Sequence, residues 1–319
     1  KITINERKQK FVFPLSAAPT WVTLDPHRIL LAEIKAIKSR QDILNQFKLS
    51  PSVIDRMEAI NMFSEESTLP PYEMYLPGLN DSFWAIRKKI LTLLPEERKE
   101  ELIPVIVNMA SKDAHSKVRA AAIEVLMNWD DESIDEIAVK GIETDSSYLI
   151  IAASLQVLFK KNNAQAYSYA EKLEAESHPA ILNTIGIIYA NQKVPGKLSF
   201  FREGLNKIND YEILAFYESF LLYGLYTGPE NTEEVINDLH KIIFEFDSLP
   251  WKRLGGMATL NNLRNLYREQ ANTSANTVEK GVLERKVTEI SSWMEEVMNK
   301  EQLKELKNVY QQLQLVEKE

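Results

Sequence analysis

The sequence predicts a mainly α-helical protein, a solenoid of stacked helix pairs preceded by two or three short β-strands. An amphipathic pattern recurs every 32 residues, beginning at Asp81, Asp113 and Asp145. Each copy has an aliphatic residue five positions after its Asp and a leucine thirteen positions after it. A fixed period of this length is typical of repeat arrays, in which each unit buries its apolar face only against its neighbours. The chain also has only 10 Gly and 13 Pro in 319 residues, which favours helices.

The first residues have a different pattern. Residues 2–4 and 11–13 alternate between apolar and polar side chains, and residues 21–24 are rich in β-formers, with prolines between these segments. So few strands cannot bury a face without a partner sheet. We therefore interpret residues 1–26 as the end of a β-sandwich domain whose remainder is missing, and residues 27–319 as a helical repeat domain.

Helical patterns are expected from about residue 28. An apolar stripe predicts the first helix, and residues 41–47 predict the second. The stripe consists of Ile29, Leu30, Ile34 and Ile37. Ser50 and Pro51 start a third helix, since proline is tolerated in a first turn. Arg56 of that helix lies 31 residues before Arg87, which makes it a first, degenerate copy of the repeat.

Two further copies start at Ser177 and Asp210, and every copy from Asp81 onward is followed by a second helix. These second helices are predicted at 100–110, 133–141, 164–176, 197–208 and 233–246. Beyond Pro250 the period fails. A helix over 251–267, a polar loop over 270–277 and two apolar seams over 283–297 and 303–313 follow. We expect residues 251–319 to cap the array, because an end repeat needs a polar outer face.

The segment 64–80 contains three prolines and a glycine and predicts a long irregular insertion. We expect Tyr72, Met74 and Tyr75 to anchor it, and a binding loop is the alternative.

Composition limits the classes of function. A net charge of −8 argues against nucleic acid as the main partner, because binding phosphates needs a basic surface. Without cysteine there are no disulfides and no thiolate sites, although this fixes no compartment. No apolar run is long enough to predict a membrane span. The chain begins with Lys1 and has no signal peptide, so we expect it to be part of a longer protein.

The sequence contains no catalytic motif. The four histidines are not spaced to share a helix face, and none is followed by Glu, so the H-E-x-x-H zinc signature is missing. His115 and His178 fall in the first turns of repeat helices, where capping or packing explains them. Gly255 and Gly256 lie in a helical pattern and are explained by close helix packing. The acidic run 130–132 is expected to supply the first turn of the next helix rather than to bind a cation.

Charged residues recur at fixed places in the repeats. The arginines of successive copies are equivalent, and the aspartates that open the copies are placed to pair with them across stacked repeats. The predicted ladder of ion pairs is structural and involves Arg56, Asp81, Arg87, Asp113, Arg119 and Asp145. An anion site would require those charges to be unpaired. We therefore predict no catalytic, cofactor-binding or metal-binding residue in the chain.

Two resemblances follow from these motifs. The pattern Asp-x4-[Ile/Val]-Arg-x2-[apolar]2-x2-Leu at 81–94 and 113–126 resembles HEAT repeats over residues 50–225, which implies a right-handed α/α superhelix. The second resemblance rests on Phe11–Leu15, Pro19, Trp21–Pro26, Leu30, Gln46–Phe47, Asp55–Arg56 and Ala59–Ile60. This junction is similar to that between the β-sandwich and the helical C-terminal domain of aminopeptidase N-like zinc metallopeptidases.

That family carries its H-E-x-x-H and G-x-M-E-N motifs upstream of the junction, and neither occurs in these 319 residues. The resemblance thus implies a non-catalytic C-terminal region that covers the active-site chamber and restricts peptide access. Zinc is expected only in the catalytic domain of the parent enzyme. The implied partners are that upstream domain and the peptide substrate. The alternatives are a freestanding HEAT-type scaffold for another protein and a relative that has lost its metal site.

Overall fold

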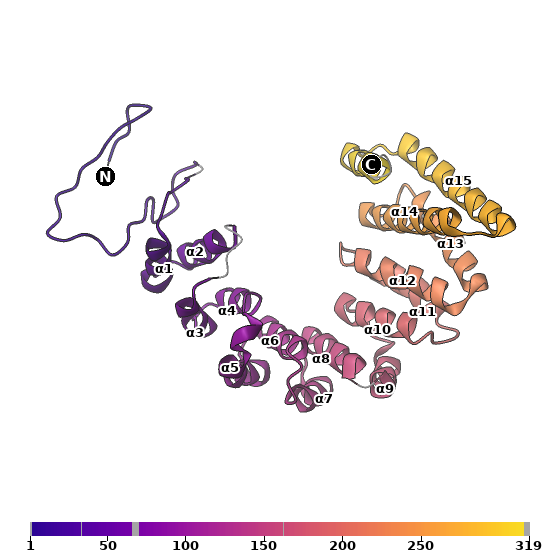
Figure 1. Ribbon diagram of the computed structural model, residues 1–319, viewed down its shortest axis with the longest axis horizontal. Coiled ribbons are helices and arrows are strands. Elements are labelled where there is room, and N and C mark those ends of the chain that lie inside the picture. The colour runs from indigo at the N-terminus through magenta and orange to yellow at the C-terminus, as the bar shows by residue number, and fades with distance from the viewer. Residues whose placement is uncertain (1, 33, 66–69, 162, 316–319) are drawn as a thin grey trace. The chain divides into compact units, whose positions relative to one another are not determined.

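The computed structural model describes residues 2–32, 34–65, 70–161 and 163–315 (Figure 1). These residues are mainly helical and form 16 α-helices with no β-strand. The chain divides into two compact units, Lys1–Asp131 and Glu132–Glu319, and each unit is described by itself. This division differs from the boundary predicted at residues 26 and 27, which stays a prediction.

The first unit contains six α-helices in two layers. One layer is formed by α2, α4 and α6, which lie side by side, and α1, α3 and α5 each pack against one of them. The bounds are α1 (Arg40–Leu49), α2 (Val53–Glu65), α3 (Tyr75–Leu79), α4 (Trp84–Leu91), α5 (Lys99–Lys112) and α6 (Ser116–Asn128), with short 3-10 turns η1 (Tyr72–Met74) and η2 (Glu96–Arg98).

The described helices of the second unit also form two layers. Helices α8, α10, α12 and α14 lie side by side, and α7, α9, α11 and α13 cover one side of them. The bounds are α7 (Ile134–Thr144), α8 (Tyr148–Lys161), α9 (Asn163–Leu173), α10 (Pro179–Asn191), α11 (Leu198–Lys207), α12 (Ile213–Thr227) and α13 (Pro229–Ile243). Each predicted copy of the repeat and each predicted second helix is therefore present.

Three longer or terminal helices close the second unit. They are α14 (Pro250–Thr273), α15 (Thr277–Lys300) and α16 (Lys304–Leu315), and both α15 and α16 pack against α14. The predicted loop over 270–277 is wrong in extent, because α14 continues to Thr273 and only residues 274–276 separate it from α15. Gly255 allows a close approach, since a Cβ there would overlap the Tyr217 ring of α12.

The segment before α1 differs from the prediction. The described residues between 2 and 39 contain neither strand nor helix, so the predicted strands are not confirmed and the helix predicted from residue 28 is wrong. Leu31 and Ile37 are fully exposed. An apolar stripe stabilises a short helix only where it packs against something, and an extended segment forms a sheet only with a partner strand. Within the described residues no strand pairs with this segment, and no helix covers Leu31 or Ile37.

The insertion at 64–80 is more regular than predicted. Residues 66–69 lie outside the described residues, but Tyr72–Leu79 form the turn η1 and the one-turn helix α3. The predicted anchors are found: Met74 and Tyr75 are buried, and the Tyr72 ring lies under the Arg98 guanidinium. Burial of these anchors against the first unit offsets the poor helix propensity of a segment rich in proline.

The prediction that the acidic run 130–132 supplies the first turn of the next helix is also wrong. Helix α7 begins only at Ile134, and the carboxylates in its first turn are Asp135 and Glu136. Asp130 lies in the turn before it, with a positive φ of 54°. Among the helices that the structure describes, none is long and apolar enough to cross a membrane.

Candidate interaction site

The repeat arginine of α2 holds the start of α4. Arg56 donates from Nε to Asp81 Oδ2 at 2.7 Å and from Nη2 to Asp81 Oδ1 at 2.9 Å. Its third nitrogen, Nη1, donates to the carbonyl oxygens of Ser50 and Pro51. Asp81 Oδ1 also accepts the amide of Phe83 at 2.8 Å, which organises the turn before α4. A bidentate pair of this kind fixes the orientation as well as the charge.

The next repeat repeats the arrangement. Arg87 donates to both carboxylate oxygens of Asp113 at 2.7 Å and, through Nη1, to the Asp81 carbonyl at 2.9 Å. Asp113 Oδ1 accepts the amide of His115. Burial opposes ionisation of Asp113, but the hydrogen bonds from Arg87 and His115 outweigh it and hold its pKa below the usual value. The hydrogen bond to Asp113 likewise raises the pKa of Arg87.

The two remaining predicted positions make local hydrogen bonds of the same kind. Arg119 Nη1 donates to the Asp113 carbonyl at 2.9 Å, and Asp145 Oδ1 accepts the amide of Ser147 at 2.9 Å. The predicted ion pairs are thus found for Arg56 with Asp81 and for Arg87 with Asp113. Their guanidinium groups are engaged by carboxylate and carbonyl oxygens, so these residues are structural and offer no anion site.

Two histidines cap repeat helices. His115 Nδ1 accepts the amide of Lys117 at 3.3 Å, and its ring stacks on Trp84 with centroids 4.1 Å apart. His178 Nδ1 accepts the amide of Ala180 at 3.2 Å in the same manner. Capping and packing therefore account for both side chains. Within the part of the chain that the structure describes, no three His, Asp or Glu side chains gather closely enough to hold a metal ion.

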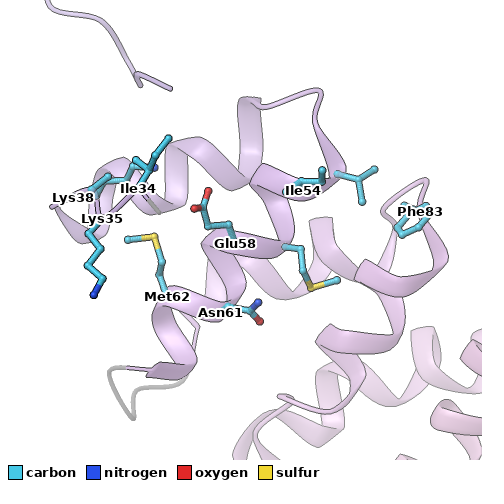
Figure 2. Close-up of a pocket in the computed structure, with 11 residues that line it drawn as sticks. Ile34, Lys35, Lys38, Ile54, Glu58, Asn61, Met62 and Phe83 are labelled. Carbon is cyan, nitrogen blue, oxygen red and sulfur yellow. The ribbon is translucent and has the colours of Figure 1, made fainter. Parts of the chain in front are cut away.

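The first unit has a groove along one face of α2 (Figure 2). It encloses about 730 Å³. Ile34, Lys35 and Lys38 lie at one end and Phe83 at the other, with side chains of α2 between them. We call residues 34–38 the strap and this cavity the α2 groove. The groove is lined by Ile34, Lys35, Ala36, Lys38, Val53, Ile54, Met57, Glu58, Asn61, Met62 and Phe83.

The groove faces solvent and has a mixed lining, in which apolar side chains lie beside Lys35, Lys38, Glu58 and Asn61. Ile54 is 58% exposed and Phe83 is 38% exposed, and the thioethers of Met57 and Met62 are only partly covered. Met is flexible and polarisable, and it is common at surfaces that adapt to a partner.

Polar contacts on both sides of the strap hold it to the first two helices. Before it, Arg28 Nη2 donates to Asp55 at 2.8 Å and to Glu58 at 3.0 Å. The hydrogen bond to Glu58 raises the pKa of Arg28, although burial opposes this. At its end, Lys38 Nζ donates to Gln46 of α1. The strap is thus tied to α1 and α2 although it has no regular secondary structure.

A second cavity lies on the other side of the strap. It encloses about 380 Å³, and residues 19 and 21–24 of the N-terminal segment form one of its walls. Ile34, Ala36 and Lys38 line both cavities. The Asn45 side chain of α1 donates to the Thr20 carbonyl at 2.8 Å and ties this wall to the first helix.

Sequence reasoning did not find this site. The pattern at residues 29–37 predicts a helix, so the extended strap is not expected there. The outward face of α2 has no periodic pattern that would mark it. The sequence does contain one signal, because Ile54, Met57 and Met62 are apolar but do not lie on the helix face that carries Ala59 and Ile60. Comparison with protein families, with characterised proteins and with solved structures yields no match to this chain.

Proposed function

We propose that this chain is the non-catalytic helical region of an aminopeptidase N-like zinc peptidase, which covers the catalytic chamber and restricts which peptides enter it. The proposal takes the finer fold to be a right-handed superhelix of HEAT-like pairs. It is supported by the helices α4, α6 and α8, which begin 32 residues apart, by the packing of α5 on α6 and of α7 on α8, and by the junction-like sequence of residues 11–30.

The observation that carries the proposal is the N-terminal segment. Its β-forming side chains are exposed, including Val12 at 77%, Phe13 at 62% and Val22 at 67%. Within the described residues 2–24, no hydrogen bond joins two backbone groups. Backbone amides and carbonyls are stable in an apolar setting only when they are paired. Such a segment suits a strand of a β-sheet domain that is joined to the helical array.

By this proposal the parent enzyme hydrolyses the N-terminal peptide bond with water activated by zinc, and the array supplies only a wall. The side chains of the described residues give no group of metal ligands, so the chemistry is assigned to the domain upstream. A wall made of rigid, stacked helix pairs suits a chamber that discriminates peptides by length.

The test compares the chain with the complete gene product. Residues 1–319, incubated with zinc and an aminoacyl chromogenic substrate, are expected to give no turnover. The complete product is expected to hydrolyse the substrate and to lose this activity on chelation. Robust hydrolysis of the substrate by the isolated chain contradicts the proposal. A gene that encodes no H-E-x-x-H ahead of Lys1 also contradicts it.

A freestanding scaffold that binds another protein is the second candidate. It is favoured by exposed apolar side chains on the α10–α12 layer of the second unit, where Ile187 is 39% exposed, Leu214 is 36% exposed and Tyr226 is 45% exposed. A start codon at residue 1 together with a complete product that lacks peptidase activity is the result that selects it.

A further inference from the structure

The turn before α12 has the same geometry as the turns before α4 and α6. Asp210 lies three residues ahead of the first residue of α12, just as Asp81 and Asp113 lie ahead of α4 and α6. In each turn the Oδ1 atom of the aspartate accepts the amide two residues later, which for Asp210 is the amide of Glu212 at 2.9 Å. The Asp210 carboxylate is therefore oriented like the two carboxylates that receive the repeat arginines.

Helix α10, which lies beside α12, does not supply the matching arginine (Figure 1). The repeat arginines stand six positions after the residue that opens each copy, and the copy that opens at Ser177 has Asn183 there. Asn183 faces the turn, because its Nδ2 donates to the carbonyl of Glu212 at 3.2 Å. The asparagine side chain is shorter than arginine and neutral, so it gives the Asp210 carboxylate no cation.

Asp210 is consequently an oriented carboxylate without a counter-charge. It is exposed, and its side chain makes one hydrogen bond within the described residues, to the Glu212 amide. The side chains of Asp81 and Asp113, in contrast, are each 8% exposed beside their arginines. The Oδ1 of Asn183 is buried and accepts no hydrogen bond from the described residues. Acceptors without a cation are complementary to a donor that carries positive charge.

The surroundings also favour a cation. Residues 132–319 contain 28 Asp or Glu and 20 Lys or Arg, so the second unit carries the whole net charge of −8. A field of this sign attracts cationic groups and speeds their association. Tyr211, the neighbour of Asp210, is 65% exposed, and an aromatic ring can stack on a guanidinium group.

We propose that Asp210 and the adjoining edge of α10 and α12 bind the guanidinium group of an arginine side chain in a peptide segment of another molecule. The bound group takes the place that the repeat arginines take on Asp81 and Asp113, where two nitrogens donate to the two carboxylate oxygens. A guanidinium is favoured over an ammonium because its planar fork matches both oxygens at once. The site lies within the second unit and does not depend on the proposed function.

Three short peptides test the chemistry. They are acetyl-Gly-Arg-Gly-amide and its citrulline and lysine analogues, titrated into ¹⁵N-labelled residues 1–319 and followed by amide NMR. The arginine peptide is expected to shift the amide signals of Tyr211 and Glu212 with a dissociation constant on the order of 1 mM. Citrulline keeps the shape but not the charge and is expected not to bind. The lysine peptide is expected to bind about tenfold more weakly than the arginine peptide.

Two variants test the location. Asp210→Asn can still accept the Glu212 amide but loses the charge, and it is expected to weaken binding of the arginine peptide about tenfold. Asn183→Arg supplies the guanidinium from within the chain, so it is expected to abolish binding and to raise the melting temperature. Asp247→Asn, at another exposed aspartate of the second unit, is the matched control and is expected to leave binding unchanged.

Three results overturn the proposal. Equal binding of the arginine and citrulline peptides, or of the arginine and lysine peptides, shows that a guanidinium is not what is recognised. Equal weakening by Asp210→Asn and Asp247→Asn shows only diffuse attraction to an acidic surface. Unchanged binding to a folded Asn183→Arg protein shows that the arginine contacts another place. Because Asp210→Asn keeps the turn, it decides the question if Asn183→Arg does not fold.

Discussion

Asp113→Asn is expected to destabilise the first unit by about 2–3 kcal/mol, midway between the loss from breaking a buried pair and that from an exposed one. The side chains of Arg87 and Asp113 are 13% and 8% exposed, so water compensates little for the lost charge. Asparagine keeps the shape and can still accept the His115 amide, but its amide nitrogen cannot accept from the guanidinium. Arg87 is then left with only carbonyl partners.

Urea unfolding followed by tryptophan fluorescence measures this loss, because Trp84 stacks on His115 beside the substituted residue. The matched control is Glu96→Gln. Glu96 is 66% exposed and lies 3.7 Å from Lys99, so at most about 0.5 kcal/mol is expected from it. The reasoning is refuted if the two variants lower the free energy of unfolding by the same amount.

The same pair predicts a pH dependence. The pKa of Asp113 is lower in the folded protein than the unfolded value of about 4, so its contribution is fully present above that value. It is lost as the pH falls through the lower folded pKa. The difference in stability between the wild type and Asp113→Asn is therefore expected to shrink as the pH falls from about 5 to 3. Unfolding midpoints measured across that range test this, and a constant difference contradicts the assignment.

Two further substitutions test packing in the second unit. Gly255→Ala is expected to lower the free energy of unfolding by about 1–3 kcal/mol, because the new Cβ overlaps the Tyr217 ring. Gly281→Ala meets open space and is expected to stabilise α15 by up to about 1 kcal/mol. Melting temperatures that shift in the same direction for both variants contradict the packing argument. Glu301→Gln breaks a pair with Arg253 in which the side chains are 2% and 3% exposed, and is expected to cost about 3–5 kcal/mol and to speed amide exchange in α16. Unchanged exchange in α16 counts against that pair as the anchor of the C-terminal helices.

The regular part of the fold could be predicted from the sequence because local and tertiary signals agree there. Asp81 and Asp113 each start a helix and each accept hydrogen bonds from an arginine of the preceding repeat, so spacing alone predicts the contact between Arg87 and Asp113. The prediction failed where an element needs a partner beyond its own neighbours. Ile34 and Ile37 have helical spacing, but in the described residues Ile37 is fully exposed and Ile34 is only partly buried, so the stripe does not form a helix.

The interaction surface could not be predicted for a related reason. Periodicity identifies the buried face of α2, through Ala59 and Ile60, but does not report that Ile54 and Met62 on its other side form a cavity with the strap. The segment before the strap is joined to α2 by the Arg28 contact with Asp55, which links residues 27 positions apart and follows no repeat.

The two carboxylates at Asp81 and Asp113 have a mechanical consequence. Each one organises the first turn of its own helix and also holds the arginine of the preceding helix. A force that pulls α2 away from its neighbours therefore acts directly on the start of α4, through Arg56 and Asp81. The pair of Arg87 and Asp113 transmits this force to the start of α6. The three helices are therefore coupled in series, and unfolding that begins at one end is resisted by all three. We expect α2, α4 and α6 to unfold together in one step rather than one after another.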